Sequence, residues 1–187
     1  APPVAARPRE FSATDIELLV RNPYGLFAKK ILRLRPLDPI DTSPGAADRG
    51  SFIHEALDAF VTAYPDDLPA NSMDKLRELG RKAFGDALEE PIVAAFWWPR
   101  FEQIAAWFVN LERDRRQSTK TVASESKGTW TFESSGGPVT ISAKADRIDQ
   151  LPDGTFSVID YKTGAVPSQE DVKLGLSPQL LVEAVIL

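Results

Sequence analysis

Apolar residues recur at helical spacing through the first 117 positions of the chain. Between 48 and 64 they lie three or four residues apart, which is typical of a helix with one buried face; they are Ile53, Ala56, Leu57, Phe60, Val61 and Tyr64. Ser12 and Asp15 have the spacing of a capping box and predict a helix that ends near Asn22. Proline positions and apolar spacing predict further helices over 24–32, 72–89 and 99–117.

After Gln117 the pattern changes to an alternation of apolar and polar residues. This alternation predicts strands over 121–132, 139–149 and 155–162. The turn signals between them are Ser134-Ser135-Gly136-Gly137-Pro138 and Pro152-Asp153-Gly154. Because such short turns join strands that run in opposite directions, we expect an antiparallel meander. Ser177 and Pro178 then suit the N-cap and first turn of a helix that continues to Leu187.

The same patterns predict the domain organisation. Residues 1–10 are rich in proline and offer little to bury, so we interpret them as a flexible arm or linker. Residues 36–47 are expected to form a loop. We expect a single domain over 11–187, with a helical part over 11–117 and a three-stranded sheet and the start of a core helix over 118–187. Because the last helix has no stop signal, we interpret the chain as a fragment of a longer protein.

Composition narrows the chemistry. The 187 residues include 43% hydrophobic and 26% charged residues, as in ordinary globular proteins. No run approaches the ~18 apolar residues of a membrane span, and no signal-peptide pattern is present, so we expect a cytoplasmic protein without a membrane partner. The absence of cysteine excludes disulfides, thiolate catalysis and an iron–sulfur cluster ligated within this chain. A single histidine with carboxylates favours hard ions such as Mg²⁺ or Mn²⁺.

The net charge of the chain is −5. This acidic balance argues against a domain that holds nucleic acid through an overall positive charge. Two local basic stretches lie at Lys29, Lys30, Arg33 and Arg35 and at Arg113, Arg115, Arg116 and Lys120. A solvated helix face is the ordinary interpretation of each stretch, and a local binding patch is the alternative.

The second and third predicted strands bring together groups that suit phosphodiester hydrolysis. Asp160 and Lys162 are two residues apart and share a face of the third strand, and Asp146 lies on the neighbouring strand. Two carboxylates can hold a divalent ion that activates water, and a nearby lysine can stabilise charge on the phosphate oxygens. Solvation, or pairing of aspartate with lysine, is the ordinary alternative, but an unpaired charge on an otherwise apolar strand is costly.

Three further polar residues are candidates with strong ordinary alternatives. His54 follows Arg49-Gly50-Ser51 near the start of a predicted helix and is a candidate metal ligand, although a lone histidine is more often packed or at the surface. Gln179 lies in the first turn of the last helix, where its amide could bind phosphate or a water. Glu125 lies on the first strand, where an exposed acid is the ordinary expectation.

These residues carry a resemblance to a known family. The ordered pieces are RGSFIHEAL (49–57), Glu125, KADRID (144–149), IDYKTG (159–164) and SPQLLVEA (177–184). They resemble the RecB-like branch of the PD-(D/E)xK nuclease superfamily, and most closely the C-terminal nuclease domain of AddB subunits of bacterial helicase–nucleases. Residues 11–34 are similar to the start of that domain. The resemblance implies an α/β fold with a restriction-endonuclease-like αβββαβ core, whose closing strand would lie beyond Leu187.

The resemblance also implies the roles of the site residues. His54, Asp146 and Asp160 would hold Mg²⁺ or Mn²⁺, with the backbone carbonyl of Tyr161 as a further ligand. Lys162 would be the catalytic lysine. Gln179 would be the helix glutamine of the family, and Glu125 matches a motif acid.

The implied activity is metal-dependent cleavage of DNA. The parent protein would process double-strand-break ends for recombination, with an AddA-like helicase subunit as partner, and this domain would cut one of the unwound strands. The chain departs from the family in lacking the four cysteines of an iron–sulfur cluster and a tyrosine four residues after Gln179. The alternatives are a non-catalytic module that binds DNA or a partner, and a stand-alone RecB-like nuclease.

Overall fold

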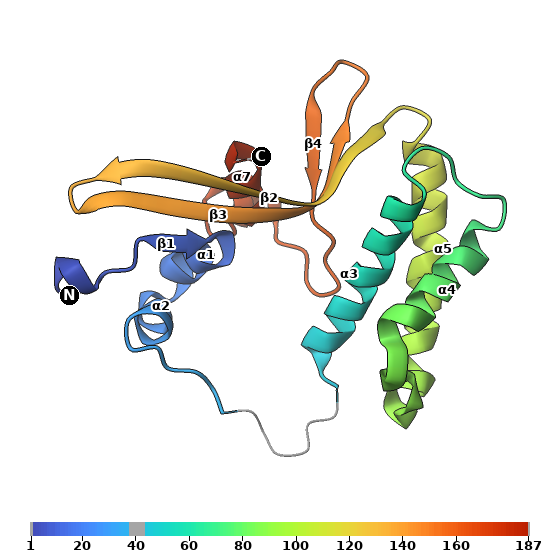
Figure 1. Ribbon diagram of the computed structural model, residues 1–187, viewed down its shortest axis with the longest axis horizontal. Coiled ribbons are helices and arrows are strands. Elements are labelled where there is room, and N and C mark those ends of the chain that lie inside the picture. Colours follow the sequence, from blue (N-terminus) through green and yellow to red (C-terminus); the bar gives the residue numbers. More distant parts are fainter. Residues whose placement is uncertain (1, 38–43, 187) are drawn as a thin grey trace. The chain divides into compact units, whose positions relative to one another are not determined.

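The computed structural model describes residues 2–37 and 44–186 (Figure 1). Residues 38–43 of the expected loop lie outside the described part. The fold is a mixed α/β arrangement, as the sequence predicts, and its described strands form a sheet in the order β1-β3-β2 with β4 paired to β3. The chain divides into two compact units. Unit 1 contains residues 1–39, 126–145 and 165–187, and unit 2 contains residues 40–125 and 146–164.

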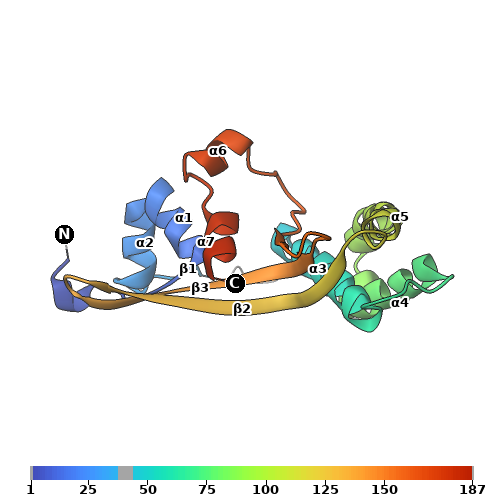
Figure 2. The ribbon, with the colours of Figure 1, turned by 90° about the horizontal axis from the view of Figure 1, so that it is seen from above.

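Unit 1 combines short helices with the distal part of a β-hairpin. Its elements include α1 (Ala13–Arg21), α2 (Pro23–Lys30), α6 (Gln169–Lys173), α7 (Gln179–Ile186) and the short strand β1 (Glu10–Ser12). The long strands β2 (Lys120–Ser134) and β3 (Gly137–Gln150) run through both units. β1 pairs with β3 in parallel, with Phe11 opposite Ile141. Figure 2 shows α1, α2 and α7 on one side of this ribbon.

A buried carboxylate organises the start of unit 1. The expected capping box is confirmed, because the Ser12 side chain accepts from the Asp15 N–H and Asp15 accepts from the Ser12 N–H. Asp15 is buried and forms ion pairs with Lys29 and Lys30 at 2.9 and 2.7 Å. Burial opposes its ionisation, but these cations and the Ser12 contacts lower its pKa far below the ordinary value. The two lysines of the first basic stretch are thus engaged in ion pairs with a buried acid of the same unit.

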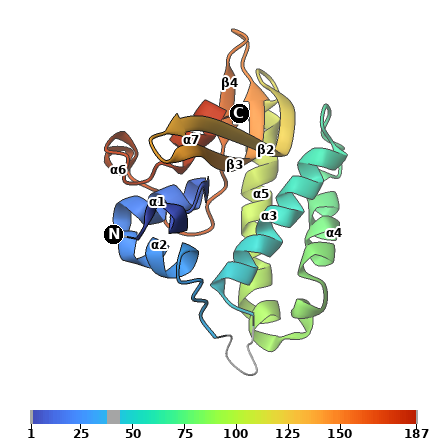
Figure 3. The same cartoon turned by 60° about the vertical axis from the view of Figure 1, so that its left-hand side comes forward.

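Unit 2 is built around a helical bundle of α3 (Ala46–Ala63), α4 (Ser72–Phe84) and α5 (Trp98–Arg115) (Figure 3). A 3₁₀ turn over Gly85–Glu89 and a π-helical turn over Val93–Trp97 connect α4 to α5. The core contains Phe60, Phe84, Phe101 and Phe108, all fully buried. Gly80 lets α4 approach α5 closely, because a Cβ there would lie 2.2 Å from the Phe101 ring.

The sheet part of unit 2 consists of the base of the β2–β3 hairpin and β4 (Phe156–Ile159). β4 pairs with β3 in antiparallel register, from Gln150 opposite Phe156 to Arg147 opposite Ile159. This pairing confirms the predicted antiparallel connection between the second and third strands.

Several element bounds differ from the prediction, each for a local reason. α4 ends at Phe84 rather than 89, because Gly85 adopts a positive φ of 48°. β4 ends at Ile159 rather than Lys162, because the carboxylate of Asp146 accepts the N–H of Tyr161 in place of a strand partner. β1 and α6 were not predicted, since three and five residues are too few for a periodic signal.

Candidate active site

The end of the β3–β4 ladder brings the two predicted aspartates to facing positions. Arg147 opposite Ile159 is the last pair of the ladder. One further step along this register places Asp146 opposite Asp160, and side chains that face each other across antiparallel strands lie on the same side of the sheet. Asp146 is on the half-buried side of β3, whereas its odd-numbered neighbours from Ala143 to Asp149 point into the protein.

Asp146 is held by groups from two other elements. Its Oδ2 accepts the N–H of Tyr161 at 2.7 Å and lies 3.4 Å from Nδ1 of His54 on α3. The hydrogen bond to Asp146 raises the pKa of His54, against the opposing effect of burial. Burial opposes ionisation of Asp146, but the contacts with His54 and the Tyr161 N–H leave its pKa below the ordinary value. Asp146 is therefore kept as a carboxylate at neutral pH.

Asp160 and Lys162 form an ion pair beside this group. Lys162 Nζ lies 2.5 Å from Oδ2 of Asp160, and 33% of the lysine side chain is exposed against 6% of the aspartate. The prediction that these two side chains share a face is consistent with this contact. The contact is equally the simple aspartate–lysine pairing that the sequence left open as the alternative to a catalytic role. An ion pair that is partly open to water can exchange partners at low cost.

The donors of this cluster fit a hard divalent ion in type. His54, Asp146 and Asp160 offer an imidazole and two carboxylates, and the electrostatic influence of Asp160 reaches His54. In the described part of the chain, however, no three His, Asp or Glu side chains form a ready-made metal site. Asp146 instead contacts His54, and Asp160 pairs with Lys162. Binding an ion would therefore displace these contacts.

Tyr161 connects this cluster to the interior. We predicted only its backbone carbonyl as a ligand, and the described contacts involve other atoms. Its N–H binds Asp146, and its ring packs edge-on against His54 and Phe108 with centroids 6.2 and 5.7 Å away. Its hydroxyl oxygen lies 3.5 Å from Nη1 of Arg147.

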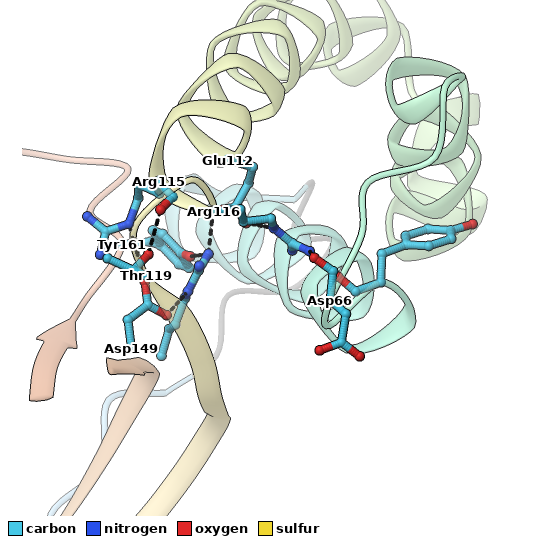
Figure 4. A network of polar contacts seen from close by, with 9 residues as sticks. Asp66, Glu112, Arg115, Arg116, Thr119, Asp149 and Tyr161 are labelled. Atoms are coloured by element: carbon cyan, nitrogen blue, oxygen red, sulfur yellow. Dashed lines mark hydrogen bonds and ion pairs between the residues drawn. The ribbon is translucent and has the colours of Figure 1, made fainter. Parts of the chain in front are cut away.

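Behind this site lies a buried ion network that sequence reasoning missed (Figure 4). Arg147 donates through Nε to Oδ1 of Asp149 at 2.5 Å and through Nη1 to Glu112 of α5. Arg115 donates to Oδ2 of Asp149 at 2.8 Å, and Arg116 donates to Glu112 at 2.9 Å. Glu112, Arg147 and Asp149 are at most 1% exposed.

Two signals in the sequence could have located the network. Arg147 and Asp149 alternate with the predicted ligand Asp146, so they lie on the opposite side of the strand. Glu112 lies four residues after Phe108, so it falls on the same buried face of α5 as Phe101, Ala105 and Phe108. A charged residue in such a position needs a buried partner.

Glu125 lies on β2 and Gln179 lies on α7. Within β2, Glu125 adopts a positive φ of 51°, a conformation that costs a residue with a side chain about 1–2 kcal/mol. Gln179 lies on α7 in unit 1, where its amide donates to Glu183 at 3.0 Å. The buried Glu183 occupies the position four residues on, where a tyrosine was expected from the resemblance. The roles of Glu125 and Gln179 stay predictions.

Comparison with known proteins identifies the family. A family model described as the PD-(D/E)XK nuclease superfamily matches residues 10–187. The chain belongs to this superfamily. The resemblance seen in the sequence is thereby confirmed, and the α/β fold is consistent with the restriction-endonuclease-like architecture of such nucleases.

Relatives of this PD-(D/E)XK chain are much longer proteins. An uncharacterized protein of Rickettsia bellii is 32% identical over 180 residues, which cover 96% of this chain and 22% of the relative. An uncharacterized protein of Rickettsia felis is 34% identical over 184 residues, with the same coverage of both chains. An ATP-dependent helicase/deoxyribonuclease subunit of Streptococcus pyogenes is 24% identical over 190 residues, which cover 93% of this chain and 16% of that protein. The chain thus spans about a fifth of the length of the first two relatives.

None of the helices in residues 2–37 and 44–186 is long and apolar enough to cross a membrane.

Proposed function

We propose that this chain is a metal-dependent DNA nuclease domain that hydrolyses phosphodiester bonds. The observation that carries the proposal is the cluster of Asp146, Asp160, His54 and Lys162 where the β3–β4 ladder ends beside α3. Membership of the nuclease superfamily supports the same reaction. Asp160-Tyr161-Lys162 also has the D-x-K form of the superfamily motif.

Each residue of the cluster has a role in this proposal. His54, Asp146 and Asp160 would hold Mg²⁺ or Mn²⁺, together with the carbonyl of Tyr161. The bound ion would supply an activated water and neutralise charge on the phosphate. Lys162, released from Asp160, would place its ammonium beside the scissile phosphate and stabilise the charge that grows on its oxygens. Gln179 would assist from α7 by binding phosphate or the attacking water.

The proposed setting is a helicase–nuclease that processes double-strand-break ends for recombinational repair. Its support is the distant homology to the streptococcal ATP-dependent helicase/deoxyribonuclease, whose matching chain is itself several times longer than this one. An AddA-like helicase would be the partner and would deliver an unwound DNA strand. The net charge of −5 fits a domain that receives its strand from a helicase rather than capturing DNA by bulk attraction.

A non-catalytic DNA- or partner-binding module is the second candidate. The observation that favours it is the pairing of Asp160 with Lys162 and of Asp146 with His54, in place of a ready-made metal site among the described residues. Calorimetric titration with Mn²⁺ separates the two candidates. A nuclease site predicts that the wild-type chain binds the ion more tightly than Asp146→Ala, whereas a pure scaffold predicts equal binding.

Digestion of DNA tests the proposed activity. Linear single- and double-stranded substrates are incubated with Mg²⁺, Mn²⁺ or EDTA and with wild type, Asp160→Ala or Asp67→Ala. Asp67 is an exposed acid in the same unit and serves as the matched control. The proposal predicts metal-dependent cutting by wild type and Asp67→Ala that Asp160→Ala loses. Cutting that survives in Asp160→Ala would reject it, as would a folded wild type that neither binds metal nor cuts.

A further inference from the structure

A polar cleft opens beside Lys162 within unit 2. Its volume is about 530 Å³, and its walls come from α3, α5 and the segment that follows β4. The wall from α3 contributes Arg49, and the wall from α5 contributes Arg100, Gln103 and Trp107. Lys162 is the first lining residue of the segment after β4. The cleft therefore lies next to the residue that the proposed function assigns to the scissile phosphate.

The cleft is cationic. Arg49, Arg100 and Lys162 line it, and none of the described lining residues carries a carboxylate. Within residues 2–37 and 44–186, neither guanidinium forms an ion pair with an acid, in contrast to Lys29, Lys30, Arg115 and Arg116. Arg49 is held over the ring of Trp97, with its Cζ 5.9 Å from the ring centroid. A guanidinium that pairs with none of the described acids can bind phosphate.

The wall from α5 also offers an aromatic surface. Arg100, Gln103 and Trp107 follow one another at helical spacing and lie on the same face. The Trp107 side chain is 58% exposed, whereas Phe101 and Phe108 of the same helix are fully buried. An indole at the edge of a cationic cleft offers a flat face on which an unpaired base can stack.

We infer that this cleft binds a single DNA strand, with Arg49 and Arg100 on backbone phosphates and Trp107 stacked on an unpaired base. The inference rests on the proposed nuclease function, and it specifies the form of the substrate. Stacking on Trp107 requires a base whose face is free, and duplex DNA does not offer one along its length.

Binding of an oligonucleotide in EDTA tests the inference without any cleavage. The probe is a fluorescent oligothymidylate of about 12 nucleotides, within the usual site size for such grooves. Trp107→Ala is expected to weaken binding by about 5- to 150-fold, which is the range that loss of one stacked base gives. Trp107→Phe, which keeps an aromatic face, is expected to restore most of the affinity. Arg100→Ala should lower the slope of log affinity against log salt by about 1.

Trp130→Ala is the matched control, because Trp130 is also exposed but lies on β2 in unit 1. It should leave binding unchanged. Equal affinity of the Trp107→Ala and Trp130→Ala variants overturns the inference, and so does duplex binding that is tighter than strand binding. Strand binding that depends on Trp107 in a chain that does not cut DNA with Mg²⁺ would leave the inference standing and reject the proposed function.

Discussion

Two polar clusters lie on opposite sides of one strand. Asp146 faces the half-open cluster with His54, Asp160 and Lys162, and its neighbour Arg147 points into the buried network with Glu112 and Asp149. Both clusters consist of paired acids and cations. They differ in access to water, since Lys162 is one-third exposed and Arg147 is 1% exposed. A solvent-accessible pair can be rearranged by a ligand, whereas a buried pair is fixed by the cost of exposing either partner alone.

The two clusters are connected through Tyr161. Its hydroxyl lies beside Arg147, its ring packs against His54, and its N–H holds Asp146. The buried network therefore fixes the segment that carries Asp160 and Lys162. We interpret the buried network as the structure that holds the site in place, and the open cluster as the groups that take part in the reaction.

The largest expected effect is on stability and comes from breaking the network. Arg147→Met leaves the buried carboxylates of Glu112 and Asp149 without a shared cation, so we expect a loss of about 3–5 kcal/mol in the free energy of unfolding. Urea denaturation measures it. Replacing Glu112 and Asp149 by leucine in the same chain should recover only part of the loss, because the buried carboxylates are gone but Arg115 and Arg116 lose their acid partners. A loss of less than about 1 kcal/mol in the free energy of unfolding for Arg147→Met would contradict the stabilising role of the network.

A large effect on activity is expected from Lys162. Lys162→Met should lower Mg²⁺-dependent cleavage by about 10²- to 10³-fold, because a positive charge beside the scissile phosphate is lost. Metal affinity should not fall, since the change frees Asp160 from its ion pair. Cleavage rates and calorimetric titration with Mn²⁺ measure the two quantities separately. An unchanged cleavage rate would remove Lys162 from the mechanism.

Metal binding should stabilise the chain through the open cluster alone. At a free Mn²⁺ concentration of about 100 times the dissociation constant, the gain is about 2.7 kcal/mol. Thermal melting of wild type should therefore shift upward with Mn²⁺, and melting of Asp146→Ala should not. An equal shift in both would place the ion elsewhere.

The smallest expected effect is a pH dependence from His54. Its folded pKa is raised by the hydrogen bond to Asp146, so its contribution to stability is complete below the ordinary value of 6.5 and is lost as pH rises through the folded pKa. The pKa of Asp146 is lowered, so its own contribution stays constant in this range. Melting in EDTA from about pH 6 to about pH 8 should show a decline in wild type that is weaker in His54→Gln.

Metal affinity should change in the opposite direction over the same range. A metal ligand must be neutral imidazole, so affinity for Mn²⁺ should increase as His54 loses its proton. Affinity that does not vary with pH would argue against His54 as a ligand.

Local sequence patterns predicted much of the fold. They failed where one long-range contact determines where a strand ends or which strand it pairs with. The spacing from Ile53 to Val61 predicted α3, and the alternation over 139–149 predicted β3. The end of β4 depends on one hydrogen bond from Tyr161 to a side chain 15 residues away, which no periodicity reports. The parallel pairing of β1 joins residues about 130 positions apart and has no local signature.

For the site, the sequence indicated residue types and faces but not their partners. The D-x-K spacing predicted that Asp160 and Lys162 share a side, and the single histidine made His54 a candidate ligand, to which the resemblance gave a role. The buried network was missed because KADRID was interpreted through Asp146 alone, and its alternate residues were not assigned partners. The cationic cleft was also missed, since Arg49 and Arg100 are far apart in sequence and neither lies in a basic stretch.

The most direct test compares two isosteric changes on the same strand, Asp146→Asn and Asp149→Asn, by Mg²⁺-dependent DNA cleavage and by thermal melting. We predict that Asp146→Asn loses cleavage and lowers the melting temperature less than Asp149→Asn does, because it gives up only the partly exposed pair with His54. Asp149→Asn should lower the melting temperature, because Arg147 and Arg115 lose a buried carboxylate. A stable Asp149→Asn variant together with an Asp146→Asn variant that still cuts would contradict the division of the strand into a chemical side and a supporting side.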